Sequence, residues 1–327
     1  MPQFLAPSGC STQGYGIIVP ILPEHLVTWG EEPVLNKVIE AGRLAQRLGA
    51  KIVGLAGFTS VVGNEGEELA KHLQIAVTSG NSLTAALSLQ GLRKSADLMG
   101  IRLNESTVAI IGATGDIGSA CTRVLAREVR NLHLVARNTS QLEEFAIQIR
   151  NESGCTVKVM KYVRDAIRDA DLILTVTSAV TTLIEPEDVK PGAIICDVAL
   201  PHNVATELLQ KRSDVLAFEG GLAKFPVKYL EGNWKWRQLS PDGVTLFGCL
   251  AETVVLALEG RFENFSIGRG YITPERIKEI ETIADRHGFR LADLRYGDFV
   301  WTEERIREVR VNANRSRYQS APQSVSN

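Results

Sequence analysis

The chain of 327 residues has no excess of charge of one sign: 36 lysines and arginines balance 38 aspartates and glutamates, a net charge of −2. Nucleic-acid-binding proteins usually carry a basic patch, so this balance argues against a nucleic-acid partner. The chain also lacks a run of about 18 apolar residues and the basic-then-apolar start of a signal peptide. We therefore expect a cytoplasmic protein without stable membrane insertion.

Cysteine is scarce and irregularly spaced, and no Cys-x-x-Cys pair occurs. The five cysteines are Cys10, Cys121, Cys155, Cys196 and Cys249. An odd number at irregular spacing argues against a disulfide framework and against a zinc site, so we expect no metal. With 44% hydrophobic and 23% charged residues, the composition is that of a soluble globular protein, and the length predicts about two domains.

Short strand-like segments alternate with helix-like segments along most of the chain. In the first hundred residues the strand-like segments are 15–19, 52–55 and 74–77, and the helical ones are 34–48 and 83–99. A second series contains six strand candidates: 107–111, 132–136, 156–160, 171–176, 193–197 and 214–218. Six short apolar strands with intervening helices predict a doubly wound parallel sheet. Two more helices are expected at 247–258 and 274–287.

The predicted fold class is α/β. It combines a Rossmann-type NADP domain, built on the doubly wound parallel sheet, with a smaller α/β substrate domain completed by C-terminal helices. The expected boundaries are 1–100 with 246–300 for the substrate and catalytic domain, 101–245 for the NADP domain, and 301–327 for a C-terminal extension. Because the chain is rich in Ser, Asn, Arg and Gln from residue 312, we expect that part to be disordered.

A glycine-rich loop follows the first strand of the second series, and a helical pattern comes directly after it. The loop reads Gly112-Ala113-Thr114-Gly115-Asp116-Ile117-Gly118. In dinucleotide-binding loops the first glycine permits the tight turn, the second lets the backbone approach the pyrophosphate, and the third allows close helix packing. The helix start adds free N–H groups and a partial positive charge. We predict cofactor contacts at 112–117; the alternative is a glycine-rich turn that binds nothing.

The end of the next strand bears on the choice of cofactor. An NAD-preferring site places Asp or Glu there, whereas this chain has Arg137-Asn138-Thr139. Arg137 can bind a 2′-phosphate, so we expect NADPH, with Asn138 and Thr139 beside it. The alternative is a solvated surface arginine. Thr177-Ser178-Ala179 follows the fourth strand at the carboxyl edge, where small residues let a nicotinamide approach. A plain strand exit explains them almost as well.

Cys249 lies where a helix is expected to begin. Unpaired N–H groups and the helix dipole favour a thiolate there, and a lowered pKa would make the sulfur a usable nucleophile. Gly248 leaves room beside it for a substrate. From chemistry alone, however, an inert buried cysteine is the more common case.

Several segments resemble one known family, the cyanobacterial long-chain acyl-acyl carrier protein reductases, from about Gly16 to Leu294. They are Gly57-Phe58-Thr59-Ser60, Ser79-Gly80-Asn81-Ser82, the glycine loop, Cys249 with Ala251-Glu252, Asn264-Phe265-Ser266 and Arg286-His287-Gly288-Phe289. The resemblance implies reduction of a fatty acyl thioester to the free aldehyde with NADPH. It makes Cys249 the acyl-accepting nucleophile. The implied partners are an acyl carrier protein or coenzyme A thioester, and a downstream enzyme that consumes the aldehyde.

Further residues are candidates for binding the acyl group. The Gly80-Asn81-Ser82 turn is expected to open a long helix and to orient the acyl carbonyl, with simple helix capping by Asn81 or Ser82 as the alternative. Thr59 and Ser60 follow a strand and are expected to line the same cleft. The sequence leaves the roles of His202, Glu252 and His287 open.

Two other functions remain open at this point. A shikimate-type alcohol dehydrogenase shares the two-domain plan but needs a Lys/Asp pair, for which Lys51 and Lys71 are the nearby candidates. The second alternative, of a different class, is an NADPH-binding regulatory protein without turnover.

Overall fold

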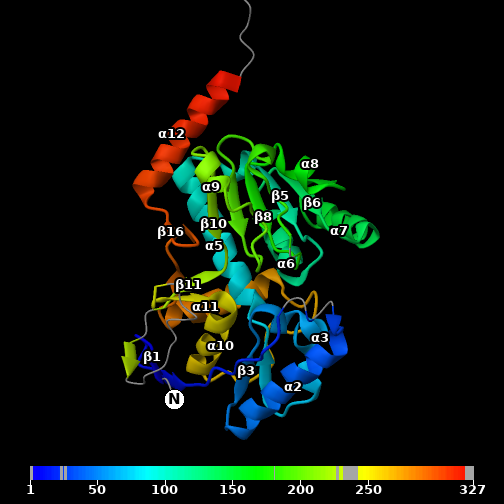
Figure 1. The fold of residues 1–327 in the computed structure, drawn as a ribbon, viewed down its shortest axis with the longest axis vertical. Helices are drawn as coiled ribbons and strands as arrows, with labels where there is room; N and C mark the ends of the chain where they lie inside the picture. The colour runs from blue at the N-terminus through cyan, green and yellow to red at the C-terminus, as the bar shows by residue number, and fades with distance from the viewer. Residues whose placement is uncertain are drawn as a thin grey trace, which may run out of the picture. The chain divides into compact units, whose positions relative to one another are not determined.

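The computed structural model describes residues 3–22, 25, 28–179, 181–225, 228–230 and 242–320. The chain divides into two compact units (Figure 1): Met1–Leu87 with Gly221–Ala292, the first unit, and Ser88–Gly220 with Asp293–Asn327, the second unit. One boundary falls inside helix α5 (Asn81–Met99), not at the expected residue 100. The reason is that the latter half of α5 packs on the second unit's sheet, where a Cβ on Gly91 would meet the ring of Phe218 at 2.6 Å.

The second unit is built on a six-stranded parallel sheet in the order β10-β9-β8-β5-β6-β7. The strands are β5 (Thr107–Ile111), β6 (Asn131–Val135), β7 (Thr156–Val159), β8 (Leu172–Thr175), β9 (Ile194–Asp197) and β10 (Leu216–Glu219). All six coincide with predicted strands. The predicted fold class is therefore confirmed: this is a doubly wound, Rossmann-type sheet.

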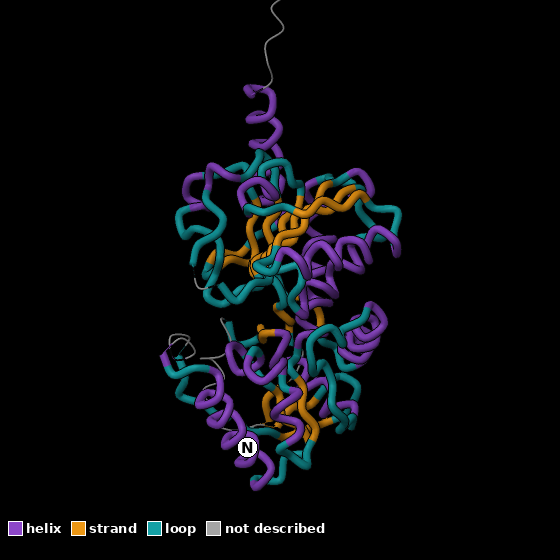
Figure 2. The backbone as a smooth tube through the Cα atoms, turned by 90° about the vertical axis from the view of Figure 1, so that its right-hand side faces the viewer, coloured by secondary structure: helices purple, strands orange, loops and turns teal. Residues whose placement is uncertain are grey.

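Helices cover both faces of this sheet because its strands are apolar on both sides (Figure 2). The helices are α6 (Asp116–Leu125), α7 (Thr139–Glu152), α8 (Val163–Ile167) and α9 (Leu208–Lys211), with short 3₁₀ turns at Leu103–Glu105 and Pro186–Asp188. On one face, alternate residues such as Ala109 and Ile173 pack with Ile167 of α8 and Leu208 of α9. The opposite face carries Ile110 and Leu134 and is equally buried.

The C-terminal part of the second unit contains β15 (Arg295–Tyr296), β16 (Phe299–Val300) and α12 (Glu303–Ser320). The prediction of disorder from residue 312 is wrong as far as Ser320; residues 321–327 lie outside the described part. Helix α12 buries Ile306, Val309 and Ala313, spaced three and four residues apart along one face. This narrow apolar stripe lies within a polar sequence, so composition alone obscures it.

The first unit combines small sheets with helices. Its strands are β1 (Gln3–Leu5), β2 (Ser11–Gln13), β3 (Ile52–Gly54), β4 (Ala76–Thr78), β11 (Leu222–Lys224), β12 (Lys228–Leu230), β13 (Thr245–Phe247) and β14 (Arg290–Leu291). Its helices are α2 (Glu31–Arg47), α3 (Val62–Glu65), α4 (Glu67–Lys71), α10 (Gly248–Glu259), α11 (Pro274–Arg286) and the 3₁₀ helix η1 (Gly57–Ser60), with the start of α5. Strand β11 pairs with β13 and β14, which explains why the second boundary falls at 220 and not at 245.

The strand expected at 15–19 is absent. This segment has no ladder partner, and the side chain of Ile18 is 85% exposed. An apolar run looks the same in sequence whether it is buried in a sheet or lies on the surface. Among the described residues, no helix is both long enough and apolar enough to cross a membrane.

Candidate active site

Cys249 is the second residue of α10, so the predicted helix start is confirmed. Helix α10 lies beside β3 in the first unit (Figure 1). Its first residue, Gly248, donates its N–H to the carbonyl of Gly221 at 2.7 Å, which ties the helix start to the turn before β11. The Cys249 side chain is only partly buried. The thiol is thus presented at the start of a helix held on neighbouring backbone.

Opposing effects act on the Cys249 thiol. Burial raises its pKa most strongly, and the charge of Glu252 adds to this. The backbone N–H groups of Gly57, Leu250 and Cys249 itself act on the sulfur in the opposite direction. The expectation of a lowered pKa is therefore wrong: the helix start acts in the predicted sense, but desolvation is the larger effect.

This balance predicts the pH dependence of thiol reactivity. Only the thiolate reacts with iodoacetamide, and the pKa of Cys249 lies above the ordinary value of about 8.5. The alkylation rate at Cys249 should therefore still rise about tenfold per pH unit between pH 7 and 8, as measured by peptide mass spectrometry. Cys155, whose pKa burial raises to about 11, should stay almost unlabelled in the same samples. A rate at Cys249 that levels off below pH 8 would contradict this balance.

Gly80 lies directly against the backbone of Cys249. Its φ is +75°, and a Cβ built there would be 2.1 Å from Cys249 Cα and 2.5 Å from Cys249 O. No side chain fits at such distances, so the first turn of α5 can approach the start of α10 only because residue 80 is glycine. The structure thus brings the predicted Gly80 and Cys249 together.

Asn81 and Ser82 are the first two residues of α5, and neither occupies the N-cap position, which falls on Gly80. Ser82 is fully buried, and its hydroxyl accepts a hydrogen bond from that of Ser266 at 2.6 Å. Asn81 is partly buried. The Ser82 hydroxyl therefore bonds within the interior of the unit, and the expected contact of Asn81 with the acyl carbonyl stays a prediction.

Thr59 and Ser60 lie in η1, where their hydroxyls bond to their own turn. Thr59 Oγ1 accepts from Ala56 N–H at 2.9 Å and donates to Ala56 O, while Ser60 Oγ donates to Gly57 O at 2.7 Å. The group of this turn that reaches the Cys249 sulfur is the N–H of Gly57. The sequence predicts that the segment Gly57-Phe58-Thr59-Ser60 lines the cleft, but it singles out Thr59 and Ser60 as binding residues and not Gly57. Its signal is a glycine at a strand exit, here with φ +56°.

The glycine loop of the second unit has the close approaches that a dinucleotide-binding loop needs. Gly112 has φ +91°, and a Cβ on Gly118 would lie 2.1 Å from Gly112 O. A Cβ on Gly115 would also crowd Gly112 O, at 3.2 Å. The bare backbone and the start of α6 at Asp116 form a cradle that fits a pyrophosphate. The N–H groups of Gly112 and Ala113 are not part of it, because both donate to Val135 O.

The other predicted cofactor residues follow β6 and β8, the two strands that pair with β5. Arg137 is exposed just after β6, and Asn138 caps α7 by accepting from Gln141 N–H at 3.1 Å. Thr139 begins α7. The turn after β8 also touches the loop, since a Cβ on Gly112 would meet Val176 O at 2.7 Å.

Within the turn after β8, hydrogen bonds fix the backbone. Thr177 Oγ1 accepts from Ala179 N–H at 3.0 Å, and Ala179 O accepts from Asn203 Nδ2 at 3.0 Å. Ser178 between them is exposed. The Ser178 side chain is therefore exposed to solvent. The hydrogen bonds of Thr177 and Ala179 hold the backbone of the turn in place.

The two histidines left open by the sequence have different surroundings. His202 lies between Asp197, at 3.4 Å, and Glu219, at 3.5 Å, at the carboxyl ends of β9 and β10. Their hydrogen bonds and charges raise the pKa of His202 to about 9, so it carries a proton at neutral pH. His287 is 1% exposed and bonds Glu259 at 2.7 Å and Ser8 at 2.9 Å. These bonds hold segments of the first unit together.

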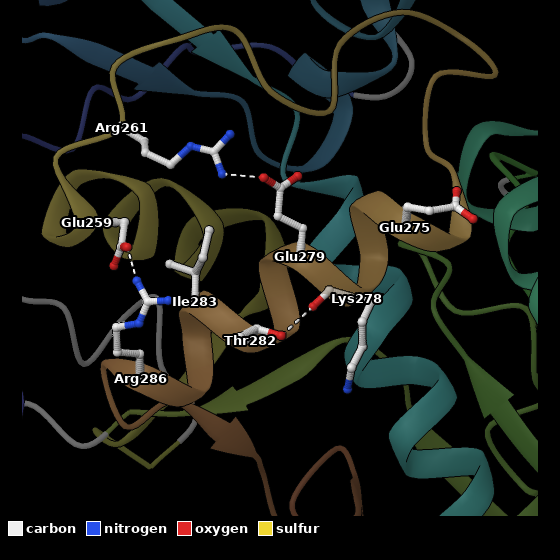
Figure 3. A pocket seen from close by; sticks show the side chains of 8 residues that line it. All are labelled: Glu259, Arg261, Glu275, Lys278, Glu279, Thr282, Ile283 and Arg286. Carbon is white, nitrogen blue, oxygen red and sulfur yellow. Dashed lines mark hydrogen bonds and ion pairs between the residues drawn. The ribbon is translucent and has the colours of Figure 1, made fainter.

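An open groove of about 510 Å³ lies at the opposite end of α10 from Cys249 (Figure 3). It is lined by Glu259, Arg261, Glu275, Lys278, Glu279, Thr282, Ile283 and Arg286. Its charges pair with one another: Arg261 with Glu279 at 2.6 Å, and Arg286 with Glu259. The groove is lined by none of the predicted site residues, so we do not assign it to the site.

The shikimate-type alternative needs a Lys/Asp pair, and neither of its two candidate lysines is paired with an aspartate. Lys51 lies 5.0 Å over the ring of Phe262, and Lys71 pairs with Glu68 on the surface. Within the described ranges, no group of three or more His, Cys, Asp or Glu side chains is arranged to hold a metal ion.

Comparison with known proteins gives matches to several reductases. Residues 94–217 match the shikimate / quinate 5-dehydrogenase family. The chain is 30% identical over 283 residues to the long-chain acyl-[acyl-carrier-protein] reductase of Synechococcus elongatus, which covers 82% of this chain and 80% of that protein. It is 30% identical over 187 residues to the glutamyl-tRNA reductase of Caldivirga maquilingensis, covering 55% and 42%.

A further relative is much longer than this chain. The aminotransferase PigE of Serratia sp. is 32% identical over 293 residues, which are 89% of this chain but only 34% of that protein. Among solved structures, the quinate dehydrogenase of Corynebacterium glutamicum in complex with NAD covers 41% of this chain and 48% of its own, at 19% identity and a TM-score of 0.31. This likeness concerns the fold alone.

Proposed function

The chain belongs to the family of the long-chain acyl-[acyl-carrier-protein] reductase of Synechococcus elongatus, and on that premise we propose that it reduces an acyl thioester to the aldehyde through a thioester at Cys249. It is an oxidoreductase with a nicotinamide dinucleotide cofactor, consistent with NADPH. The observation that carries the proposal is the position of Cys249: a partly buried thiol at the start of α10 with three backbone N–H groups acting on its sulfur.

The proposed reaction has two steps at Cys249. The thiolate attacks the acyl carbonyl carbon, a carbon–sulfur bond to Cys249 forms, and the bond to the carrier sulfur breaks. The carrier leaves as a thiol with the proton that Cys249 gave up. When bound, NADPH supplies the hydride for the carbonyl carbon of the enzyme thioester. The carbon–sulfur bond then breaks, and the aldehyde leaves as the Cys249 thiolate reforms.

Negative charge develops on the acyl oxygen in both steps. The N–H groups of Gly57 and Leu250 act on the Cys249 sulfur, and we propose that they also donate to this oxyanion. Between turnovers the same N–H groups stabilise the Cys249 thiolate, because they act to lower the pKa of the thiol. Backbone donors serve this purpose well because they need no reorganisation during the reaction.

Two thioester donors share the chemistry that this site needs, acyl-acyl carrier protein and acyl-coenzyme A. Each offers an acyl carbonyl and a thiol leaving group. Intact-mass spectrometry of the protein with each donor, in the absence of NADPH, is expected to find the acyl mass on Cys249. Addition of NADPH should then discharge the adduct as the aldehyde.

A free fatty aldehyde is reactive, so we also propose that an aldehyde-consuming enzyme acts next.

The same experiment separates the alternatives. NADPH binding without an adduct and without aldehyde from either donor would favour a non-catalytic regulatory protein. Aldehyde formation without any adduct would favour direct hydride transfer, as a dehydrogenase would perform it.

The cofactor preference is expected to depend on Arg137. Its exposed guanidinium follows β6, where the 2′-phosphate of NADPH would be bound, and a charge-assisted contact of this kind contributes about 1.5–3 kcal/mol. The variant R137A should therefore bind NADPH roughly tenfold to a hundredfold more weakly by fluorescence titration, with NADH binding unchanged. R102A, an exposed arginine paired with Glu105, is the control. Equal weakening for both cofactors would contradict a role in 2′-phosphate recognition.

A further inference from the structure

Glu252 is a buried acid on the same helix as Cys249, three residues further along. Its side chain is completely buried, and both of its oxygens accept hydrogen bonds. Oε2 accepts the N–H of Leu83 at 2.7 Å, and Oε1 accepts the hydroxyl of Thr78. The carboxyl group therefore connects α10 to the end of β4 and to the first turn of α5.

This connection continues from Thr78 to the backbone that touches Cys249. Thr78 Oγ1 also accepts the N–H of Gly80 at 3.1 Å. Gly80 in turn lies so close to Cys249 that a Cβ would be 2.1 Å from its Cα. One buried carboxyl group thus acts on the segment that forms a wall of the thiol site, both through the Thr78 hydroxyl and directly at the Gly80 backbone.

The need for Glu252 follows from the need for glycine at position 80. The first N–H groups of a helix lack intrahelical partners, and an N-cap side chain usually satisfies one at the third helical position. The N-cap of α5 is Gly80, which has no side chain, and there is no room for one. Leu83 occupies the third helical position, and its N–H is satisfied by Glu252 from another helix. An acid near a helix start is also favoured by the dipole.

We propose that Glu252 is a positioning residue that caps α5 from α10 and thereby holds Gly80 against Cys249. The capping role stands on its own, whereas its consequence for acyl transfer rests on the proposed function. The charge of Glu252 has a second effect that can be measured separately, because it opposes formation of the Cys249 thiolate. Positioning and charge therefore predict opposite changes in two reactions of the same sulfur.

The test compares E252Q, E252D and T78V with the matched control E259Q in the full chain. Glu259 is on the same helix, but its partners are Arg286 and His287. Each variant is assayed for iodoacetamide alkylation of Cys249 from pH 6.5 to 9.5 and for acyl transfer from acyl-coenzyme A in the absence of NADPH. Thermal unfolding is recorded for each, so that loss of fold is recognised.

For E252Q we expect alkylation of Cys249 at pH 7 to be faster than in wild type and in E259Q, since the substitution removes a charge that raises the pKa of the thiol, while acyl transfer falls about tenfold or more. In E252D the charge remains but the shorter side chain loses its reach, so alkylation should stay near wild type while acyl transfer falls. T78V, which keeps the carboxyl group and removes the hydroxyl, should also lose acyl transfer. E259Q should match wild type in both assays.

The proposal is overturned if folded E252Q or T78V transfers the acyl group as fast as E259Q. It is also overturned if E252Q and E259Q have the same alkylation profile, since Glu252 would then not act at the thiol. If the wild-type protein itself takes no acyl group, the proposed function fails, and the alkylation profiles of E252Q and E259Q still decide whether Glu252 acts on Cys249.

Discussion

The variant C249S is expected to lose acyl transfer and aldehyde formation by at least about 10³-fold. A serine hydroxyl has nearly the same size as the thiol, so the start of α10 should remain intact. The three N–H groups that act on the sulfur cannot ionise a hydroxyl at neutral pH, and serine has no adjacent base in the proposed mechanism. NADPH binding should be unchanged, because the glycine loop belongs to the second unit.

The measurement is single-turnover aldehyde formation, with intact mass to detect the acyl adduct. C10S is the matched control, since Cys10 belongs to the same unit, is exposed and takes no part in the proposed mechanism. C10S should keep full activity. Turnover by C249S within about tenfold of wild type would contradict the thioester mechanism. Direct hydride transfer to the substrate, as in a dehydrogenase, would then be the better explanation.

The variant G80A should lose both stability and activity. The added Cβ would lie 2.1 Å from Cys249 Cα and 2.5 Å from Cys249 O, so backbone must move, and the φ of +75° adds strain. We expect about 3–5 kcal/mol lower free energy of unfolding, the upper range for single substitutions, measured by urea denaturation. The shift of the α5 start should slow acyl transfer by about a hundredfold in the fraction that remains folded.

The control for G80A separates backbone strain from crowding. Gly49, in the same unit, has a φ of +84°, but nothing lies within 4 Å of a Cβ built there. G49A should therefore cost only the conformational penalty of about 1–2 kcal/mol and leave acyl transfer unchanged. If G80A loses no more free energy of unfolding than G49A and keeps acyl transfer, the close approach of residue 80 to Cys249 is not needed for activity.

Local patterns in the sequence determined much of this protein. The six parallel strands are short apolar runs bounded by turns, and they lie within a few residues of the predicted segments. Gly112, Gly115 and Gly118 were recognisable because strand, turn and helix follow one another directly. Cys249 was placed correctly at a helix start because that start depends on residues next to it. All of these features arise from neighbours in the chain.

Tertiary structure alone decided the chemistry around Cys249. Glu252 meets Thr78 across 174 positions of sequence, and Gly57 reaches the sulfur from a separate turn. No local pattern contains such contacts. The direction of the Cys249 pKa was wrongly predicted for the same reason: the helix start is local, whereas the burial that outweighs it depends on the packing of the whole unit. The sequence placed Cys249 at a helix start, and long-range packing set the environment of its thiol.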